Sequence, residues 1–589
     1  MKKLTALVLA LVMCFGLVAC GSTPAPSSTP ASESTSQPEA TNENFVDPVN
    51  GWGVYDELID QIRTETDLAK RAELMHQAED ILMDTGAILP LYFYTDIYLQ
   101  KDYLTNVYWT PFGYKYFMFA ELGNGADTLH LYLASEPDKL DPALNSTVDG
   151  AILAINAFSG LFTYNADHEQ VPDLVDTYEV SEDGLTYTFT LKDGLKWSNG
   201  ETLDASDFVY SWNRAVNPMT ASDYAYMFSP IKGYDEMTKM DADGNLVNPD
   251  AQLAVTASED GKTLTVELAF PCAYFLDLCA FPTYFPVYQE AVEAADPEGN
   301  NPGAWALEPG ENFVCNGAYV LTEWNHNSSM TYEKNPNYHR ADEVKIEKQE
   351  FMLSSDETAT FAAYNAGDLD FSDGVPTAEI AGLQGNPEYR VIGTLGTYYV
   401  SFNVNSPMFD GMSPEDAATL RKALALFIDR DYLVTNVGQA DQVPAGSFIP
   451  AGCLDGNGGE FKNKDYYDPS AEAFEDNVAK GIEMMESIGY KFENGMLSAE
   501  TPLSFTYLVN TPGGNVDVAV AIQADMAAVG IDMQISEMEW NVFLNDRKAG
   551  NFDVARNGWL MDYNDPLNML EMWTSDSGNN DCQFGKPKA

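Results

Sequence analysis

The sequence predicts a multidomain protein of the α/β class, and three observations support this prediction. The chain has 589 residues, of which 45% are hydrophobic, so it can form large packed cores. At common domain sizes of ~100–200 residues, this length corresponds to about two to four domains. Stretches in which apolar residues alternate, as in strands, recur together with stretches in which they repeat every three or four residues, as in helices.

An export signal is predicted at the N-terminus. Two lysines precede an apolar run from Leu4 to Val18, and a small residue precedes Cys20. This pattern is typical of a signal peptide, and the run is shorter than the ~20 apolar residues of a membrane span. The four residues ending at Cys20 resemble the bacterial lipobox, which implies that residues 1–19 are removed and Cys20 is lipidated. An ordinary cleaved signal or an uncleaved anchor is the alternative.

Residues 20–44 are predicted to form a flexible tether after the lipidated cysteine. They are rich in Ser, Thr, Pro and Glu and have no apolar periodicity. Such a segment cannot bury enough surface to offset the entropy lost on ordering. We therefore expect a folded body held outside the cytoplasm, at a membrane, by a lipid anchor.

The folded body begins with a predicted helix over residues 55–84, in which Leu58, Ile62, Leu74 and Ala78 recur at helical spacing. Strands are predicted where apolar residues alternate, at 129–133, 185–191, 264–268, 503–509 and 531–535. A helical pattern over 516–529 joins the last two strands, and this succession is a βα unit.

The composition excludes several classes of function. The chain has 31 Lys and Arg against 90 Asp and Glu, a net charge of −59. A surface this acidic repels nucleic acid and offers no basic patch to anionic lipid. Its five histidines lack metal-site spacing, and no Cys-x-x-Cys occurs. Because P-loop, GxSxG, HExxH and helix-opening GxGxxG motifs are also missing, we expect no cofactor, no metal site and no catalysis.

Five cysteines remain after Cys20, at positions 272, 279, 315, 453 and 582. We expect them to be buried as small apolar residues. One or two disulfides outside the cytoplasm are the alternative, and the sequence does not pair them.

Three segments of the chain resemble one protein family. They are 191–200 (LKDGLKWSNG) followed by 207–212 (DFVYSW), 317–321 (GAYVL) followed by 333–338 (EKNPNY), and 552–566 (FDVARNGWLMDYNDP). These segments are similar to the peptide-type (family 5) extracellular solute-binding proteins, the receptors of oligopeptide ABC importers. The resemblance implies a two-lobe, periplasmic-binding-protein-like fold of class II with a small accessory domain, in which the lobes close on a ligand by hinge motion.

The order of segments departs from this family. There, the segments resembling residues 55–84 and 88–94 lie at the C-terminus, after the one resembling 577–580. The resemblance therefore implies a circular permutation in which the old ends are joined near 121–125, and a rearranged or truncated gene is the alternative. Permutation is tolerated where a loop is exposed and the old termini are close.

The resemblance also implies a division of the chain. Lobe two begins with the permuted segment 45–94 and is completed by 396–589. Lobe one comprises 95–163 and 253–395, and the accessory domain 164–252 lies between them in the chain. The hinge strands are expected to cross near Thr95 and Gly396.

Nine residues are predicted to bind the ligand by the resemblance. Asp562 matches the aspartate that binds the α-ammonium of the peptide, a role that suits a buried carboxylate; an Asx turn before Pro566 is the alternative. Arg547 and Arg556 match arginines able to meet the peptide carboxylate; surface ion pairing is the alternative for Arg547. The remaining positions match residues lining the ligand or its side-chain pockets, with core packing as the alternative for the tryptophans: Trp540, Trp559, Gly558, Tyr398, Tyr399 and Asn403.

Gly396 and Leu560 stand where some relatives carry a disulfide-bonded cysteine pair, which implies loss of that bridge. We therefore expect a monomeric oligopeptide receptor that delivers its ligand to an ABC permease in the membrane. The same fold binding a dipeptide, sugar or metal complex is the first alternative. A sensor or adhesin built on the scaffold and a secreted peptidase are the others.

Overall fold

The computed structural model describes residues 45–241, 245–511 and 514–587. The predicted signal peptide, Cys20 and the tether therefore lie outside the described residues. Over the described ranges, none of the helices combines the length and the apolar character that crossing a membrane requires.

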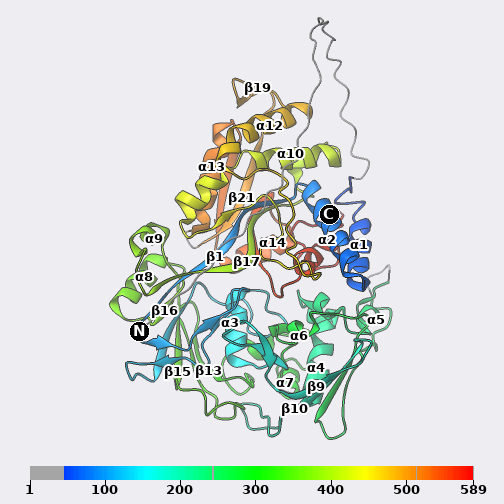
Figure 1. The fold of residues 1–589 in the computed structure, drawn as a ribbon, viewed down its shortest axis with the longest axis vertical. Helices are drawn as coiled ribbons and strands as arrows, with labels where there is room; N and C mark the ends of the chain where they lie inside the picture. Colours follow the sequence, from blue (N-terminus) through cyan, green and yellow to red (C-terminus); the bar gives the residue numbers. More distant parts are fainter. Residues whose placement is uncertain (1–44, 242–244, 512–513, 588–589) are drawn as a thin grey trace, which may run out of the picture. The chain divides into compact units, whose positions relative to one another are not determined.

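The largest sheet has seven strands and forms the centre of one lobe, which we call lobe two (Figure 1). Its strands run in the order β16-β1-β17-β23-β21-β22, and β18 pairs with β1. Their bounds are Phe371–Ser372 (β16), Ile88–Gln100 (β1), Tyr389–Phe402 (β17), Val554–Leu560 (β23), Ser504–Asn510 (β21), Asp532–Met538 (β22) and Val443–Pro444 (β18). The predicted βα unit is confirmed, because β21 and β22 are parallel and α13 (Gly514–Ala528) connects them.

The long antiparallel pair β1 and β17 runs through this sheet to the other lobe. Thr95 lies opposite Gly393, and the register shifts between Phe93 and Thr95, which marks a bulge next to the expected crossing. Gly396 lies directly opposite Leu560 on β23, so the two positions that replace the disulfide of some relatives are cross-strand neighbours. A side chain at Gly396 would overlap Leu560.

Lobe one is built on a four-stranded sheet in the order β13-β14-β15-β6. Its strands are β13 (Tyr319–Asn325), β14 (Ser329–Lys334), β15 (Lys348–Leu353) and β6 (Thr128–Leu133), of which only β15 and β6 pair in parallel. Helices α3 (Val148–Ala157), α8 (Glu357–Ala366) and α9 (Thr377–Leu383) belong to this part of the chain (Figure 1).

A further antiparallel sheet is formed by β11 (Val255–Ala257), β12 (Thr263–Glu267), β10 (Thr186–Leu191) and β9 (Val175–Val180), in that order. Helix α4 (Ala205–Val216) packs against it and buries Phe208 and Trp212. The boundary expected at 252/253 falls inside this unit, because β11 and β12 pair with β10. Buried residues alternate along β10 and β12, whereas β9 is exposed after Val175.

The segment expected to form one helix over 55–84 forms two. Helix α1 (Gly53–Thr64) ends before Glu65, and α2 (Leu68–Asp84) begins after Asp67. The Asp67 carboxylate accepts hydrogen bonds from the amides of Ala69 and Lys70, both at 3.1 Å. This N-cap starts a new helix where the apolar pattern alone predicted continuation.

Helices α1 and α2 are held against the C-terminal part of the chain. The Trp52 ring stacks on Phe584 at 4.2 Å between centroids, and the Tyr55 hydroxyl donates to the Leu570 carbonyl at 2.8 Å. Gly585 donates its amide to the Pro48 carbonyl at 2.9 Å. Residues at opposite ends of the described chain therefore form one packed unit.

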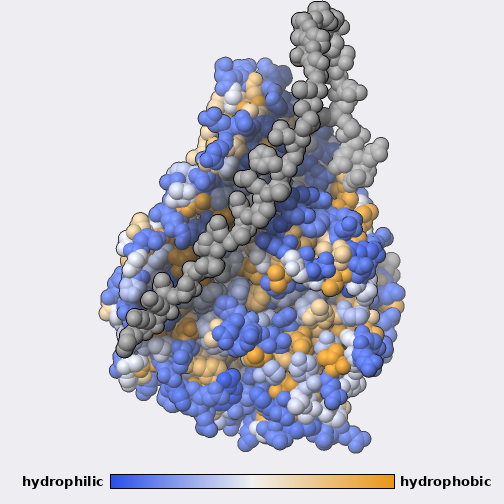
Figure 2. Space-filling model, in the orientation of Figure 1, coloured by the Kyte–Doolittle hydropathy of each residue, from blue (hydrophilic) through white to orange (hydrophobic). Residues whose placement is uncertain are grey.

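The remaining longer helices cover lobe two: α10 (Pro414–Leu426), α12 (Phe474–Ser487) and α14 (Trp540–Ala549). The five described cysteines are buried and unpaired, as expected for small apolar residues. Figure 2 shows a largely hydrophilic face on which apolar residues are scattered, which fits an acidic protein exposed to water.

Candidate functional site

A cavity of about 360 Å³ lies where the ends of the long sheet meet α3 and α14. Its wall combines residues from lobe one, such as Ser135 and Asp149, with residues from lobe two, such as Asn510 and Arg556. The volume is near the lower end of the ~300–1,000 Å³ usual for small-ligand sites. The cavity therefore suits a short ligand held between two parts of the protein.

Six of the nine predicted site residues line this one cavity: Trp540, Arg547, Arg556, Gly558, Trp559 and Asp562. Four of them follow one another on β23 and in the loop after it, and two lie on α14. The strand is continuous with the central sheet, which gives these side chains a rigid support.

Asp562 lies in the loop that follows β23 and is 5% exposed. Its Oδ2 accepts a hydrogen bond from Asn568 Nδ2 at 2.9 Å, and its Oδ1 accepts from the hydroxyls of Tyr114 and Tyr224, both at 3.4 Å. All three donors are neutral. No cation pairs with this carboxylate among the residues that the structure describes.

Burial raises the pKa of Asp562 to about 7, although its three hydrogen bonds act in the opposite direction. Burial also raises the pKa values of Tyr114 and Tyr224, and the nearby carboxylate adds to this effect, so both phenols remain donors at neutral pH. A buried carboxylate with only neutral donors is matched electrostatically by a cationic ligand group.

The two tryptophans hold different places in the wall. Trp559 donates its indole N–H to Asn568 Oδ1 at 3.0 Å, and the same oxygen accepts the amide of Asp562 at 3.0 Å. Asn568 therefore fixes Trp559 and Asp562 together. Trp540 begins α14 and stacks on Phe543 at 5.8 Å, which leaves part of the ring to line the cavity.

Position 558 has no room for a side chain, because a neighbouring tyrosine occupies the space. A Cβ at this position would overlap the hydroxyl of Tyr94, a cavity residue on β1. The same hydroxyl accepts a hydrogen bond from Arg556 Nη2 at 3.3 Å. The absence of a side chain at Gly558 thus allows Tyr94 to approach β23 and orient Arg556.

The two predicted arginines differ in their partners. Arg547 Nε lies 2.8 Å from Asp581 Oδ2, as an ion pair outside hydrogen-bond alignment. Arg556 contacts the Tyr94 hydroxyl and the Tyr398 ring, whose centroid is 5.0 Å from the guanidinium carbon, and it forms no ion pair with any residue that the structure describes. Of the two, Arg556 is the one whose charge is available to a ligand carboxylate.

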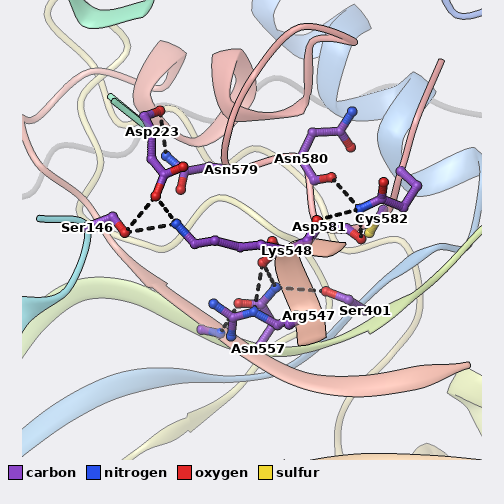
Figure 3. A network of polar contacts seen from close by, with 12 residues as sticks. Ser146, Asp223, Ser401, Arg547, Lys548, Asn557, Asn579, Asn580, Asp581 and Cys582 are labelled. Carbon is purple, nitrogen blue, oxygen red and sulfur yellow. Dashed lines mark hydrogen bonds and ion pairs between the residues drawn. The ribbon is translucent and has the colours of Figure 1, made fainter. Parts of the chain in front are cut away.

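A polar network includes residues of the cavity wall on the side of α14 (Figure 3). Lys548 forms an ion pair with Asp223 and donates to the Ser146 hydroxyl at 2.9 Å, while that hydroxyl donates to Asp223 at 3.1 Å. Asn579 Nδ2 donates to the Asp223 carbonyl at 3.4 Å. These contacts connect lobe two to the segments before α3 and after α4.

The other three predicted residues have their side chains elsewhere. Tyr398 stacks on Tyr92 at 4.8 Å and lies behind Arg556. Tyr399 projects from the opposite face of β17 and packs against Phe448, because successive strand residues point to opposite faces. Asn403 donates to the Gly550 carbonyl at 2.8 Å and thereby holds the end of α14.

Sequence reasoning missed several residues that line the cavity or contact its predicted residues. Asn568 lies two residues after the segment 552–566, and this closeness in sequence was the signal that could have identified it. Tyr114 and Tyr224 lie 448 and 338 residues from Asp562 in the chain, and Tyr94 and Asp149 belong to other segments again. No pattern along the sequence connects these residues to the site.

The described ranges 45–241, 245–511 and 514–587 contain no cluster of three or more His, Cys, Asp or Glu side chains placed to hold a metal ion. In the cavity wall, the hydroxyls of Tyr114 and Tyr224 lie next to the Asp562 carboxylate. The described residues that line the cavity include no histidine or cysteine.

Residues 169–581 match the bacterial extracellular solute-binding proteins, family 5, middle region. The match spans more than half of the chain, and the protein belongs to this family. It is 32% identical over 474 residues to the oligopeptide-binding protein OppA of Bacillus subtilis (strain 168), covering 79% of this chain and 81% of that protein. It is 31% identical over 458 residues to the dipeptide-binding protein DppE of the same organism, covering 78% of each.

Among solved structures, the fold is similar to that of the murein tripeptide-binding protein MppA of Escherichia coli. The TM-score is 0.68 at 29% identity, and the similarity covers 79% of this chain and 85% of that one. Haemophilus influenzae OppA in complex with the peptide RPPGFSPFR gives a TM-score of 0.68 at 28% identity, with 78% and 85% covered. These similarities confirm the predicted family and the two-lobe α/β fold.

Proposed function

We propose that the protein is an oligopeptide receptor that encloses a short, extended peptide between its lobes and delivers it to an ABC permease. The observation that carries the proposal is Asp562, a buried carboxylate that faces a cavity and whose partners among the described residues are all neutral. A peptide α-ammonium supplies the missing charge, and Arg556, which lacks a carboxylate partner among the described residues, suits the other end of the peptide. The relatives that bind oligopeptides support this choice.

The decisive test compares two aspartates of the same loop. Asp562→Asn keeps the shape and one acceptor oxygen, which can still receive the Asn568 hydrogen bond, but removes the charge. Peptide affinity is therefore expected to fall ~30- to 5,000-fold, or ~2–5 kcal/mol. Above pH 7, the melting temperature of the ligand-free variant should equal or exceed that of the unchanged protein. Because the folded pKa is raised, ionisation of Asp562 costs stability as pH rises through about 7, and asparagine removes that cost.

Asp565→Asn is the matched control. The Asp565 carboxylate binds the Arg71 guanidinium through two hydrogen bonds of 2.7 and 2.9 Å, and both side chains are buried. Its replacement should destabilise the fold by ~3–5 kcal/mol because Arg71 is left without a charge partner.

Unchanged peptide affinity in Asp562→Asn, measured by calorimetry, would disprove the proposed role. Competition by dipeptides or sugars in the same assay tests the alternative solutes.

We also propose that the family order is circularly permuted in this chain. The similarity to relatives covers about four fifths of the chain, and the matched family region begins at residue 169. Residues 48 and 585 are hydrogen-bonded neighbours, and the connection through Asn124 and Gly125 is exposed. Both places are therefore suited to a break or a join of the chain.

The location outside the cytoplasm and the lipid anchor are further parts of the proposal. They are supported by the family and by the signal-like sequence that ends at Cys20. Labelled palmitate should be incorporated into the protein, and Cys20→Ser should abolish the incorporation. An anchor of this kind would keep the receptor close to its permease.

A further inference from the structure

The charged side chains that line the cavity do not balance one another. Six of them are in the wall: Asp149, Arg547, Lys548, Arg556, Asp562 and Asp581. Arg547 is paired with Asp581, and Lys548 is paired with Asp223 outside the wall. Across the described residues, the other three have no oppositely charged side chain within ion-pairing distance, which leaves two negative charges and one positive charge for the ligand.

Asp149 is the unexplained member of this set. It lies in the first turn of α3, on the lobe-one side of the cavity. The proposed peptide contacts use Asp562 for the ammonium and Arg556 for the carboxylate, so neither end of the peptide needs Asp149.

The surroundings of Asp149 add negative charge. Lys115 is buried and already shared by two carboxylates, with its Nζ 2.7 Å from Asp96 and 3.0 Å from Asp373. Counting Asp149, this corner holds three carboxylates and one ammonium. Burial, followed by repulsion from Asp373, raises the pKa of Asp149 to about 7, and Lys115 offsets this only in part.

We propose that Asp149 is a specificity residue that binds a cationic side chain of the peptide, so that the receptor selects peptides with one net positive charge. The inference rests on the proposed function. A lysine or arginine side chain supplies the ammonium or guanidinium that this corner lacks. A peptide carrying a glutamate there would be repelled by the Asp149 carboxylate, which lines the cavity.

The test uses calorimetry on the full chain with alanine tripeptides and tetrapeptides. Each carries one lysine, glutamine or glutamate after its first residue, so that the backbone and both ends are constant. At one of these positions, the peptide with lysine should bind at least tenfold more tightly than the peptide with glutamine. The peptide with glutamate should bind more weakly than the peptide with glutamine. In Asp149→Asn, the lysine-to-glutamine ratio should fall to near one, whereas Asp149→Glu should retain a preference for lysine.

Glu293→Gln is the control for removal of one charge, because this exposed residue of α7 (Gln289–Ala295) lies outside the cavity wall. It should leave the ratio as in the unchanged protein. The inference is overturned if peptides bind but lysine gives no advantage at any position, or if the advantage survives in Asp149→Asn. If no peptide binds at all, the proposed function itself fails, and the inference fails with it.

Discussion

Asp562 and Asp565 lie in one loop but differ in their electrostatic surroundings. Asp565 faces the guanidinium of Arg71, and Asp562 faces two tyrosines and an asparagine. An ion pair compensates the burial of the Asp565 carboxylate, whereas no cationic side chain of the described residues pairs with Asp562. A buried charge without a partner lowers the stability of the fold, and ionisable groups in such environments are frequent at binding sites.

This environment predicts a pH dependence of binding. In the ligand-free protein the pKa of Asp562 is about 7, so a growing share of the carboxylate is protonated as pH falls below that value. Only the ionised form pairs with a peptide ammonium, which stays protonated in this range. Affinity for a neutral tripeptide is therefore expected to fall about tenfold per pH unit between pH 6.5 and pH 5.

Calorimetric titrations from pH 8 to pH 5 provide the measurement. Asp562→Asn is the control, since its weaker binding should not change over the same interval. A constant affinity of the unchanged protein between pH 7 and pH 5 would contradict the assignment of Asp562 to the ammonium.

At the scale of elements, α14 supplies two neighbouring cations that are both engaged. Arg547 is paired within lobe two, while Lys548 reaches Asp223 and Ser146 on the other side of the cavity (Figure 3). The Lys548 contact therefore joins the two sides of the cavity, as do the hydrogen bonds from Asn579 to the Asp223 carbonyl and from Tyr114 and Tyr224 to Asp562. The Lys548 and Asp223 side chains are 23% and 26% exposed, so solvent weakens the pair without removing it.

Lys548→Met is expected to speed peptide dissociation about fivefold, which corresponds to ~1 kcal/mol for a partly buried pair. The effect should shrink in high salt, because screening already weakens the pair in the unchanged protein. Stopped-flow displacement of a labelled peptide measures the rate. Lys232→Met is the matched control, since Lys232 pairs with Glu267 on an exposed surface away from the cavity. Equal dissociation rates in Lys548→Met and the unchanged protein would exclude such a latch.

At the scale of the whole molecule, helix α2 and strand β1 are integral to lobe two, although they come early in the chain. Strand β1 lies between β16 and β17 in the seven-stranded sheet, and it also supplies Tyr94 to the cavity wall. Arg71 of α2 holds the loop that carries Asp562. Folding of the site thus depends on residues that are close to opposite ends of the sequence.

The permutation predicts that the chain can be reconnected without loss of the fold. A chain that begins at Ala126, ends at Gly125 and joins residue 587 to residue 45 through about six glycine and serine residues should melt cooperatively. It should bind peptides as before, because all contacts are kept and only loop entropy changes.

The control is a chain reconnected in the same way but opened between Tyr94 and Thr95, within the pairing of β1 and β17. It should lose its cooperative melt. Failure of the first chain to fold, with the original chain folding normally, would refute the permuted arrangement.

The sequence by itself determined the local elements and the family. The strands near 129–133, 185–191, 264–268 and 503–509 and the βα unit were predictable because alternation and helical spacing follow from which face is buried. The segment 552–566 placed Asp562, Arg556 and Trp559 at the site because residues close in sequence on one strand and its loop stay close in space.

Only the tertiary structure decided how the charges of the site are partnered. The break at Asp67 depended on a side-chain cap that competes with the apolar pattern. Arg547 is paired with Asp581, whereas Arg556 contacts the Tyr94 hydroxyl, so only the fold distinguishes the two arginines. The fold also brings Asp149 of lobe one to the same cavity as Asp562. Electrostatic energy depends on distance and burial, and both are set by contacts between segments hundreds of residues apart.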